Sequence, residues 1–587
     1  MRARAALLAL ILCGCGGTGS HFGDQDGGGD ATSPDGGGPK DGSLSFGDTG
    51  TGDGSGCPLG CSSDLHNVID CNNNVVQTCT GTQGCDVSSG TCMDACTAAV
   101  NNKNSVGCEY YATFMDQYDG ASACFVAFVA NTWNTDVHIN VEFNGSTLPI
   151  NNFARIPSGK GQNITYGNYT GALPPGQLAI LFLGGSQGGA PLCPIATAED
   201  TAAMISGTDV GHSFHITTDV PVVSYEMNPY GGGNAAVTGA SLLLPVSAWD
   251  VNYIASTASP DTAGPPGVTI IAAQDNTQVT FLPKVALVGG GKIPGGAANT
   301  PVKFTLQKGE QAQIEQSTDL VGSVISSSAP VGVMAGNPCM NAPQGVSYCD
   351  HGEQMLPPVR ALGHEYVGVQ YRPRSGEPAI WRIVGAVDNT TLTFSPAISG
   401  APGSISQGQM AEFNTGTPFV VKSQDDKHPF MMFEYMSGST WSLLADQSGF
   451  GDPDFSVQVP PEQYLSHYVI LTDPSYPETN LVLIRRPDPK NAFQDVTIDC
   501  LGTPITGWKP VGAYEWTRLD LQTGDFQDVG GCSNGRHELK SNAPFGLGIW
   551  GWGTPNTTSF TANVSYSYPG GMNVQPINTV VVPPTPH

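Results

Sequence analysis

The hydrophobic positions of the chain fall in short alternating runs separated by polar turns. Val279-Thr280-Phe281 and Leu392-Thr393-Phe394 are examples, and an Asp-Asn-Thr sequence begins or precedes each run. Alternation of this kind places successive side chains on opposite faces of a β-strand. Roughly six or seven such strands fall in each hundred residues, which predicts an all-β protein.

One pattern recurs four times: a strand, a short polar turn, and a second strand that begins after a proline. The prolines are Pro221, Pro330, Pro429 and Pro544, so the period is about 100 to 115 residues. We therefore predict four tandem modules, each an antiparallel β-sandwich-like unit. A β-propeller-like closed repeat is the alternative, because one blade needs about 40 to 50 residues.

The N-terminus is typical of a bacterial lipoprotein signal. Arg2 and Arg4 precede an apolar run, and the sequence Leu-Cys-Gly-Cys then ends at Cys15. We predict cleavage before Cys15 and attachment of lipid to its thiol, with a plain secretory signal as the alternative. Gly16 rather than an aspartate at the next position favours an outer-membrane, surface-exposed lipoprotein of the cell envelope.

Residues 16–56 are rich in glycine and contain seven aspartates but almost no large apolar side chains. Such a segment cannot offset its ordering entropy by burial, so it is expected to be a disordered tether. No part of it has the ligand positions of an EF-hand.

The cysteines predict a disulfide framework. Removing Cys13 and the lipidated Cys15 from the 16 cysteines leaves 14, an even number in an exported protein. Zinc is the weaker alternative for the dense group near the N-terminus. The six later cysteines are expected to pair as Cys339 with Cys349, Cys500 with Cys532 and, by elimination, Cys124 with Cys193. The dense group consists of Cys57, Cys61, Cys71, Cys79, Cys85, Cys92, Cys96 and Cys108.

These observations divide the chain into eight segments. They are a lipoprotein signal peptide (1–14), the tether (15–56), a Cys-rich disulfide-stapled segment (57–108), four β modules (109–240, 241–345, 346–455 and 456–575) and a C-terminal tail (576–587).

Charge and hydropathy exclude two classes of protein. The formal net charge is −27, and no basic run reverses it locally, so a nucleic-acid partner is not expected. No apolar stretch of membrane-spanning length occurs after the N-terminus. The lipid at Cys15 is therefore the predicted membrane attachment.

Few residues of the sequence are candidates for catalysis or metal binding. Gly184-Gly185-Ser186-Gln187-Gly188 has the spacing of a nucleophile elbow, but a flexible glycine loop is the better interpretation. Asp350, His351 and Glu353 form the densest metal-like cluster, although the set is short of ligands for a closed zinc site. We expect instead a loop held by a Cys339–Cys349 disulfide, with His351 hydrogen-bonded to a neighbouring module.

Two pairs of aromatic residues at strand spacing are also candidates for binding. Tyr514 with Trp516, and Trp550 with Trp552, could stack on a sugar ring, but core packing is their expected role.

The sequences Gly107-Cys-Glu-Tyr-Tyr111, Cys349-Asp-His-Gly-Glu-Gln-Met-Leu-Pro-Pro358 and Leu362-Gly-His-Glu-Tyr-Val367 carry a resemblance. Together with the proline-led strands, they resemble the immunoglobulin-G Fc-binding-protein N-terminal domain family over about residues 105–570. Myxobacterial-type lipoproteins combine such a domain with a lipid anchor, a tether and a Cys-rich segment. The resemblance implies a secreted or surface adhesion-like binding module, and it supplies no catalytic residues to transfer.

We therefore expect a non-enzymatic surface lipoprotein without a cofactor or metal, whose partner is an extracellular protein or glycan. A secreted hydrolase or metalloprotein that uses the cluster around His351 is the first alternative. A purely structural component of the envelope is the second.

Overall fold

The computed structural model describes residues 58–585 except 73, 119, 121, 187–192, 233–234, 259–263, 375, 442–449 and 556–561. All described residues belong to one compact unit, residues 48–587. The signal peptide, Cys15, the tether and Cys57 lie outside the described residues, so what the sequence indicates about them stays a prediction.

The all-β prediction is confirmed. Among the described residues the chain forms one α-helix, α1 (Ala95–Asn102), and otherwise strands and short 3-10 turns. No helix in this part of the chain is long and apolar enough to cross a membrane.

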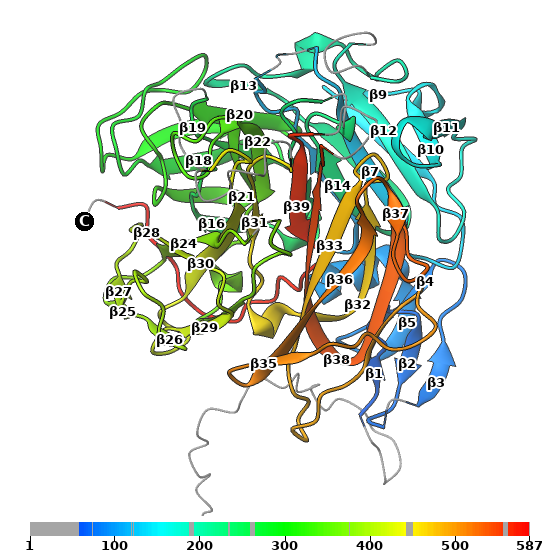
Figure 1. The fold of residues 1–587 in the computed structure, drawn as a ribbon. Coiled ribbons are helices and arrows are strands. Elements are labelled where there is room, and N and C mark those ends of the chain that lie inside the picture. The colour runs from blue at the N-terminus through cyan, green and yellow to red at the C-terminus, as the bar shows by residue number, and fades with distance from the viewer. Residues whose placement is uncertain are drawn as a thin grey trace, which may run out of the picture. The chain divides into compact units, whose positions relative to one another are not determined.

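Most strands belong to four sets, which appear in chain order from blue to red in Figure 1. Set 1 contains β6 (Gly107–Ala112), β7 (Phe125–Asn131), β8 (Ile139–Phe143), β14 (Phe214–Met227) and β15 (Ala240–Leu242). Set 2 contains β16 (Asp250–Ile254), β17 (Gly267–Ala272), β18 (Thr277–Leu282), β21 (Val324–Met340) and β22 (Asp350–Met355). Set 3 contains β23 (Glu365–Gly368), β24 (Ala379–Gly385), β26 (Thr393–Ser395), β29 (Phe419–Lys422), β30 (Phe430–Met436) and β31 (Asp454–Val457). Set 4 contains β32 (Leu465–Thr472), β33 (Glu478–Arg485), β34 (Val496–Ile498), β38 (Gly535–Trp552) and β39 (Ser565–Pro569).

Shorter strands extend the sets. They are β9 (Ser146–Thr147), β10 (Ala154–Ser158), β11 (Thr165–Asn168), β12 (Leu178–Gly184), β13 (Asp209–His212), β19 (Val302–Leu306), β20 (Glu310–Glu315), β25 (Thr390–Thr391), β27 (Ser404–Ile405), β28 (Met410–Thr415), β35 (Lys509–Val511), β36 (Tyr514–Thr523) and β37 (Gln527–Asp528). The Cys-rich segment forms β1 (Gly60–Cys61), β2 (Asn67–Ile69), β3 (Val75–Thr78), β4 (Gln83–Asp86) and β5 (Thr91–Asp94).

Every set has the same antiparallel pairing scheme around one long strand. The long strand is β14, β21 or β38, and in set 3 it is represented by β29 followed by β30. Its first half pairs with the first and third strands of the set, as β14 does with β6 and β8. Its second half pairs with the second and last strands, as β14 does with β7 and β15. The other three sets repeat this scheme.

The long strand corrects one detail of the sequence interpretation. In sets 1, 2 and 4 the chain runs through Pro221, Pro330 and Pro544 as one continuous strand, so the expected turn is absent there. Only in set 3 does a gap before Pro429 separate two strands. Proline has no N–H to donate to a ladder. It is tolerated here because the long strand exchanges its neighbours close to the proline.

A buried tyrosine in the first strand of each set fixes this exchange point. Its hydroxyl donates to the backbone carbonyl oxygen of the residue that follows the proline, at 2.7–2.8 Å in sets 1 to 3. The fourth set has the same bond. The four pairs are Tyr110 with Val222, Tyr253 with Val331, Tyr366 with Phe430, and Tyr468 with Phe545.

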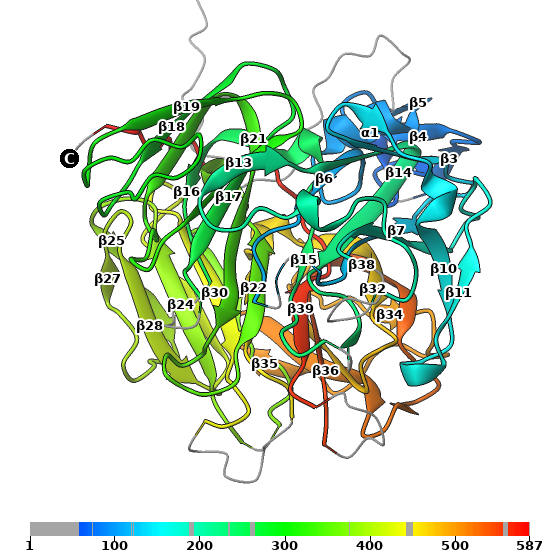
Figure 2. The same ribbon diagram turned by 90° about the horizontal axis from the view of Figure 1, so that it is seen from above.

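The last strands of the sets contact one another in a closed cycle. β15 contacts β22, β22 contacts β31, β31 contacts β39, and β39 contacts β15. Figure 2 shows β15, β22 and β39 lying side by side in the middle of the view. We call these four the inner strands.

The hydrophobic cores lie between sets. The largest core joins set 1 to set 4, as Tyr225 with Tyr568 shows. A second joins sets 2 and 3, and a third joins sets 3 and 4. The sandwich-like form of the modules stays a prediction.

The chain after β39 binds the beginnings of the sets together. The backbone N–H of Val574 donates to Lys103, that of Ile577 donates to Arg360, and that of Val582 donates to the side chain of Asn252. This segment thus contacts the residues just before β6, the turn before β23, and β16.

We predict that Tyr253→Phe lowers the free energy of unfolding by about 2 kcal/mol. The substitution keeps the ring but leaves the Val331 carbonyl without its hydroxyl donor and the Asp250 N–H, 3.0 Å from the hydroxyl, without its acceptor. Urea unfolding followed by tryptophan fluorescence measures the change. The matched control is Tyr118→Phe, because Tyr118 is 61% exposed. Equal stability of the two variants would contradict the role of the hydroxyl.

Candidate functional site

The Asp350, His351 and Glu353 cluster lies on β22, one of the inner strands, where all three residues are 0% exposed. Nε2 of His351 is 3.4 Å from Oε2 of Glu353. The expected hydrogen bond from His351 to a neighbouring module is wrong, because neither ring nitrogen has a hydrogen-bond partner among the described residues. Burial lowers the pKa of His351 to about 3, so the imidazole is neutral.

The fold adds two acidic residues to this cluster that the sequence interpretation missed. Asp452 and Asp454 come from β31 and the residues just before it, and they are 1% and 0% exposed. Burial and the charges of Asp452 and Asp454 raise the pKa of Asp350 well above its usual range. Burial and the charge of Glu353 do the same to the pKa of Asp454.

Hydrogen bonds tie this acidic region to β39 and to the residues just before β15. The N–H of Thr238 donates to Oδ1 of Asp350 at 3.1 Å. The Ser565 hydroxyl donates to the carbonyl oxygen of Asp452 at 2.6 Å and accepts from the N–H of the same residue at 2.9 Å. Each contact joins two different sets. The centre of the inner strands is therefore polar and buried.

Two further buried glutamates occupy equivalent positions in sets 1 and 3, five residues after the proline. Glu226 accepts the N–H of Thr113 at 2.9 Å, and Glu434 accepts the N–H of Tyr371 at 2.9 Å. Both donors follow the first strand of their set. Burial raises the pKa of Glu226 well above its usual range and that of Glu434 to about 8.

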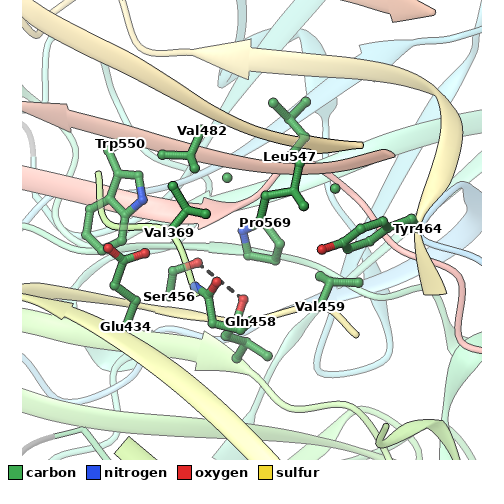
Figure 3. A pocket seen from close by; sticks show the side chains of 14 residues that line it. Val369, Glu434, Ser456, Gln458, Val459, Tyr464, Val482, Leu547, Trp550 and Pro569 are labelled. Carbon is green, nitrogen blue, oxygen red and sulfur yellow. Dashed lines mark hydrogen bonds between the residues drawn. The ribbon is translucent and has the colours of Figure 1, made fainter. Parts of the chain in front are cut away.

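Glu434 also lines a narrow cavity between sets 3 and 4, shown in Figure 3. In that view Glu434 lies beneath Trp550 at one end of the cavity, and Tyr464 lies at the other end. The walls between them are mainly apolar, with Val369, Val482 and Leu547 among the lining residues. The space admits only about two water molecules.

A second cavity of similar size lies where the Cys-rich segment meets sets 1 and 4. Asp64, Trp133 and His467 line it. His467 accepts or donates a hydrogen bond at 2.7 Å to Glu538, which is itself paired with Lys540. His467 and Lys540 are thus both paired with Glu538, and we assign no catalytic role to this cavity.

The sequence candidates for catalysis do not form a reactive constellation among the described residues. The N–H of Ser186 donates to the carbonyl oxygen of Ser122 in a loop after β12, and Gln187 and Gly188 lie outside the described residues. Asp499, Cys500 and His537 place three ligand-type atoms within 4.8 Å of one another. However, Cys500 is bonded to Cys532, so its sulfur is not a thiolate ligand.

The aromatic pairs lie in the core or close to it. Trp550 and Trp552 are 1% exposed, and Trp516 is 8% exposed, while Tyr514 is half-buried with its hydroxyl 2.9 Å from Glu365. The two tryptophans of β38 pack against Tyr371. They stabilise the contact between sets 3 and 4.

Disulfide bonds are present throughout the described chain. Cys124 is joined to Cys193, Cys339 to Cys349 and Cys500 to Cys532, the same pairs named from the sequence. In the Cys-rich segment the bonds are Cys61–Cys85, Cys79–Cys92 and Cys96–Cys108, and Cys71 is also disulfide-bonded. The Cys96–Cys108 bond fixes α1 to β6.

Two comparisons with known proteins bear on function. Residues 239–551 match the family model described as IgGFc binding protein, a stretch that runs from the start of β15 to the end of β38. The human IgGFc-binding protein is 27% identical over 222 residues, which is 36% of this chain. The match spans 4% of the length of that human protein.

We predict that Glu434→Gln removes a pH dependence of stability. The unfolded glutamate titrates near 4.5 and the folded one near 8, so the stabilisation from this carboxyl is complete below pH 4.5 and is lost as the pH rises to 8. The slope is on the order of 1 kcal/mol per pH unit.

Urea unfolding of wild type and variant at several pH values between 5 and 8 measures this effect. The glutamine should lose less stability with rising pH than the wild type. Asp426→Asn, at an exposed position, serves as the control and should follow the wild type. Parallel curves for Glu434→Gln and wild type would contradict the prediction.

Proposed function

Because the chain belongs to the IgGFc binding protein family, we propose that it is a non-enzymatic binding protein whose partner is an extracellular protein or glycan. The observation that carries this proposal is the family match over residues 239–551. The matched residues include sets 2 and 3 and the long strand of set 4. They therefore include β22 and β31, the inner strands that carry Asp350 and Asp454. The relative is named for binding IgG Fc, so an immunoglobulin-like protein is one candidate partner for this chain.

The geometry supports binding at the exterior. The two cavities described above admit water-sized molecules, so neither is large enough for a ligand of ordinary size. Large aromatic side chains often anchor a partner. In this chain Trp381, Trp550 and Trp552 are buried in the core. Recognition is therefore expected to use the loops and strand edges on the surface of the sets.

The repeated pairing scheme supports a closed arrangement of the four sets. The inner strands contact one another in a cycle, and each hydrophobic core includes side chains from more than one set. Independent sandwiches would each bury a core of their own. We propose that the sets are copies of one unit that close into a propeller-like repeat, which makes a single rigid platform for loops.

The proposed location is the cell surface, with a lipid at Cys15 and the tether as spacer. The sequence at the N-terminus supports this, because the residues before Cys15 have the charge, hydrophobicity and small-residue pattern of a lipoprotein signal. A flexible acidic spacer would hold the binding unit away from the membrane.

Binding is tested on a surface-proteome array that includes IgG Fc and on a glycan array, each probed with the purified protein. We expect saturable binding to at least one protein or glycan. The same protein after heat unfolding is the control, and it should lose the signal. Saturation by Fc would extend the property in the relative's name to this chain, whereas the absence of any saturable signal would contradict the binding proposal.

Lipid attachment is tested by labelling cells with radioactive palmitate and separating the membrane fraction. Cys15→Ala should lose the label and leave the membrane, because the acceptor thiol is gone. Cys13→Ala is the matched control and should keep both. Labelling of Cys15→Ala at the wild-type level would overturn the assignment of the anchor.

A further inference from the structure

The inner strands bring oxygen-bearing side chains from three sets to one buried place. Asp350 begins β22, Asp454 begins β31, and Ser567 lies in the middle of β39. All three are 0% exposed. About a hundred residues of sequence separate each of these residues from the next. They come close only because the fold brings β22, β31 and β39 together.

Hydrogen bonds hold these strands in a fixed relation. The side-chain nitrogen of Gln354 on β22 donates to the carbonyl oxygen of Ser567 at 2.8 Å and to that of Ala240 on β15 at 2.9 Å. The Ser565 hydroxyl links β39 to Asp452, two residues before β31, as described above. One glutamine side chain and one serine side chain thus connect all four inner strands, so the oxygen atoms between them have little freedom to move.

Three oxygen atoms in this place make no hydrogen bond of normal distance and angle with any described residue. They are Oδ2 of Asp350, Oδ2 of Asp454 and Oγ of Ser567. Ser567 still interacts with the Asp454 carboxyl through its hydroxyl and its backbone, and this interaction lowers the pKa of Asp454 against the stronger opposite effect of burial. An unpartnered oxygen in a dry interior costs about 1–3 kcal/mol, and more when it is charged. Three together indicate a partner that the protein itself does not supply.

No cationic side chain of the described residues forms an ion pair with Asp350 or Asp454. Arg374 is the nearby cation that acts on Asp452, but Glu377 holds its Nε at 2.9 Å, and the carbonyl oxygens of Phe450 and Ser437 take its terminal nitrogens. His351 is neutral. Backbone N–H groups of Thr238 and Phe455 each donate to one oxygen of these two carboxyls. No cationic side chain of the described residues offsets a charge on the second oxygen.

We propose that the inner strands bind a hard divalent cation of the Ca²⁺ class through Asp350, Asp454 and Ser567. A cation between the two carboxylates satisfies the three unpartnered oxygens and cancels the repulsion. The donor set consists of oxygen atoms, which suits Ca²⁺ or Mg²⁺ and disfavours Zn²⁺ and Cu²⁺. Backbone carbonyls and water complete the coordination, which Ca²⁺ tolerates better than Mg²⁺ because its geometry is less strict.

A bound cation would join sets 2, 3 and 4 at the centre of the cycle. It would act on the arrangement of the sets rather than on a reaction, because its ligands are buried. The alternative state of the same residues is protonation of one or both carboxyls, which also removes the repulsion. The two states differ in their response to added metal.

The test uses the full chain, dialysed against a chelator and then titrated with CaCl₂. We expect native mass spectrometry to show one bound Ca²⁺ and the melting temperature to rise saturably. Tb³⁺ should bind at the same site and luminesce when it is excited through the neighbouring aromatic rings, such as Tyr566 between the two serines of β39.

Asp454→Asn should weaken Ca²⁺ binding at least tenfold and remove the rise in melting temperature. Glu434→Gln is the matched control, since it also neutralises a buried carboxyl but lies outside the proposed ligands, and it should keep both effects. If Asp454→Asn does not fold, Ser567→Ala provides the second variant, with a smaller loss of affinity expected.

Two outcomes would overturn the proposal. One is the absence of bound metal and of any thermal shift with CaCl₂ or TbCl₃. The other is an Asp454→Asn variant that binds Ca²⁺ as tightly as the wild type. A third result would identify the protonated state instead. In that case Ca²⁺ changes the melting temperature of neither protein, and Asp454→Asn is more stable than the dialysed wild type.

Discussion

The arrangement of the four sets depends on one hydrogen bond made four times. In each set a buried tyrosine of the first strand donates to the carbonyl oxygen just after the proline of the long strand. The proline removes a ladder donor at the point where the long strand leaves one pair of neighbours and joins another. The tyrosine hydroxyl satisfies the carbonyl that this exchange exposes. Without the tyrosine hydroxyl, the carbonyl group after the proline would be buried in the interior with no hydrogen-bond donor.

Because the long strand changes neighbours, each set bends away from a flat sheet and delivers its last strand to the inner cycle. The last strands then meet those of the other sets, and their polar residues are buried away from bulk solvent. Among them, Gln354 and Ser565 have complete hydrogen bonding, whereas Asp350 and Asp454 do not. Incomplete hydrogen bonding of these fully buried carboxyls is the observation that leads to the cation proposal.

The sequence predicted the all-β class and located the four prolines, because both are properties of local pattern. It did not predict that three of the prolines lie inside continuous strands, since that depends on which neighbours the strand has. The tyrosines could have been found: Pro245, Pro358 and Pro460 each precede a tyrosine by eight residues, at Tyr253, Tyr366 and Tyr468. Asp350 and His351 were noticed because they are adjacent in the chain. Asp454 and Ser567 were missed because only the three-dimensional pairing of distant strands makes them part of the same cluster.

The last inner strand, β39, lies near the end of the chain and yet contacts β15, which is part of set 1. A chain is made from its N-terminus, and its earlier parts can begin to fold before the later parts exist. The first three sets can therefore form their own ladders during synthesis, but the cycle remains open until β39 has been made. Closure is thus a single late event with very long sequence separation, which makes it slow compared with the formation of each set. Loss of β39 would therefore affect the centre of the molecule rather than its edge, because β39 contacts the inner strands β15 and β31.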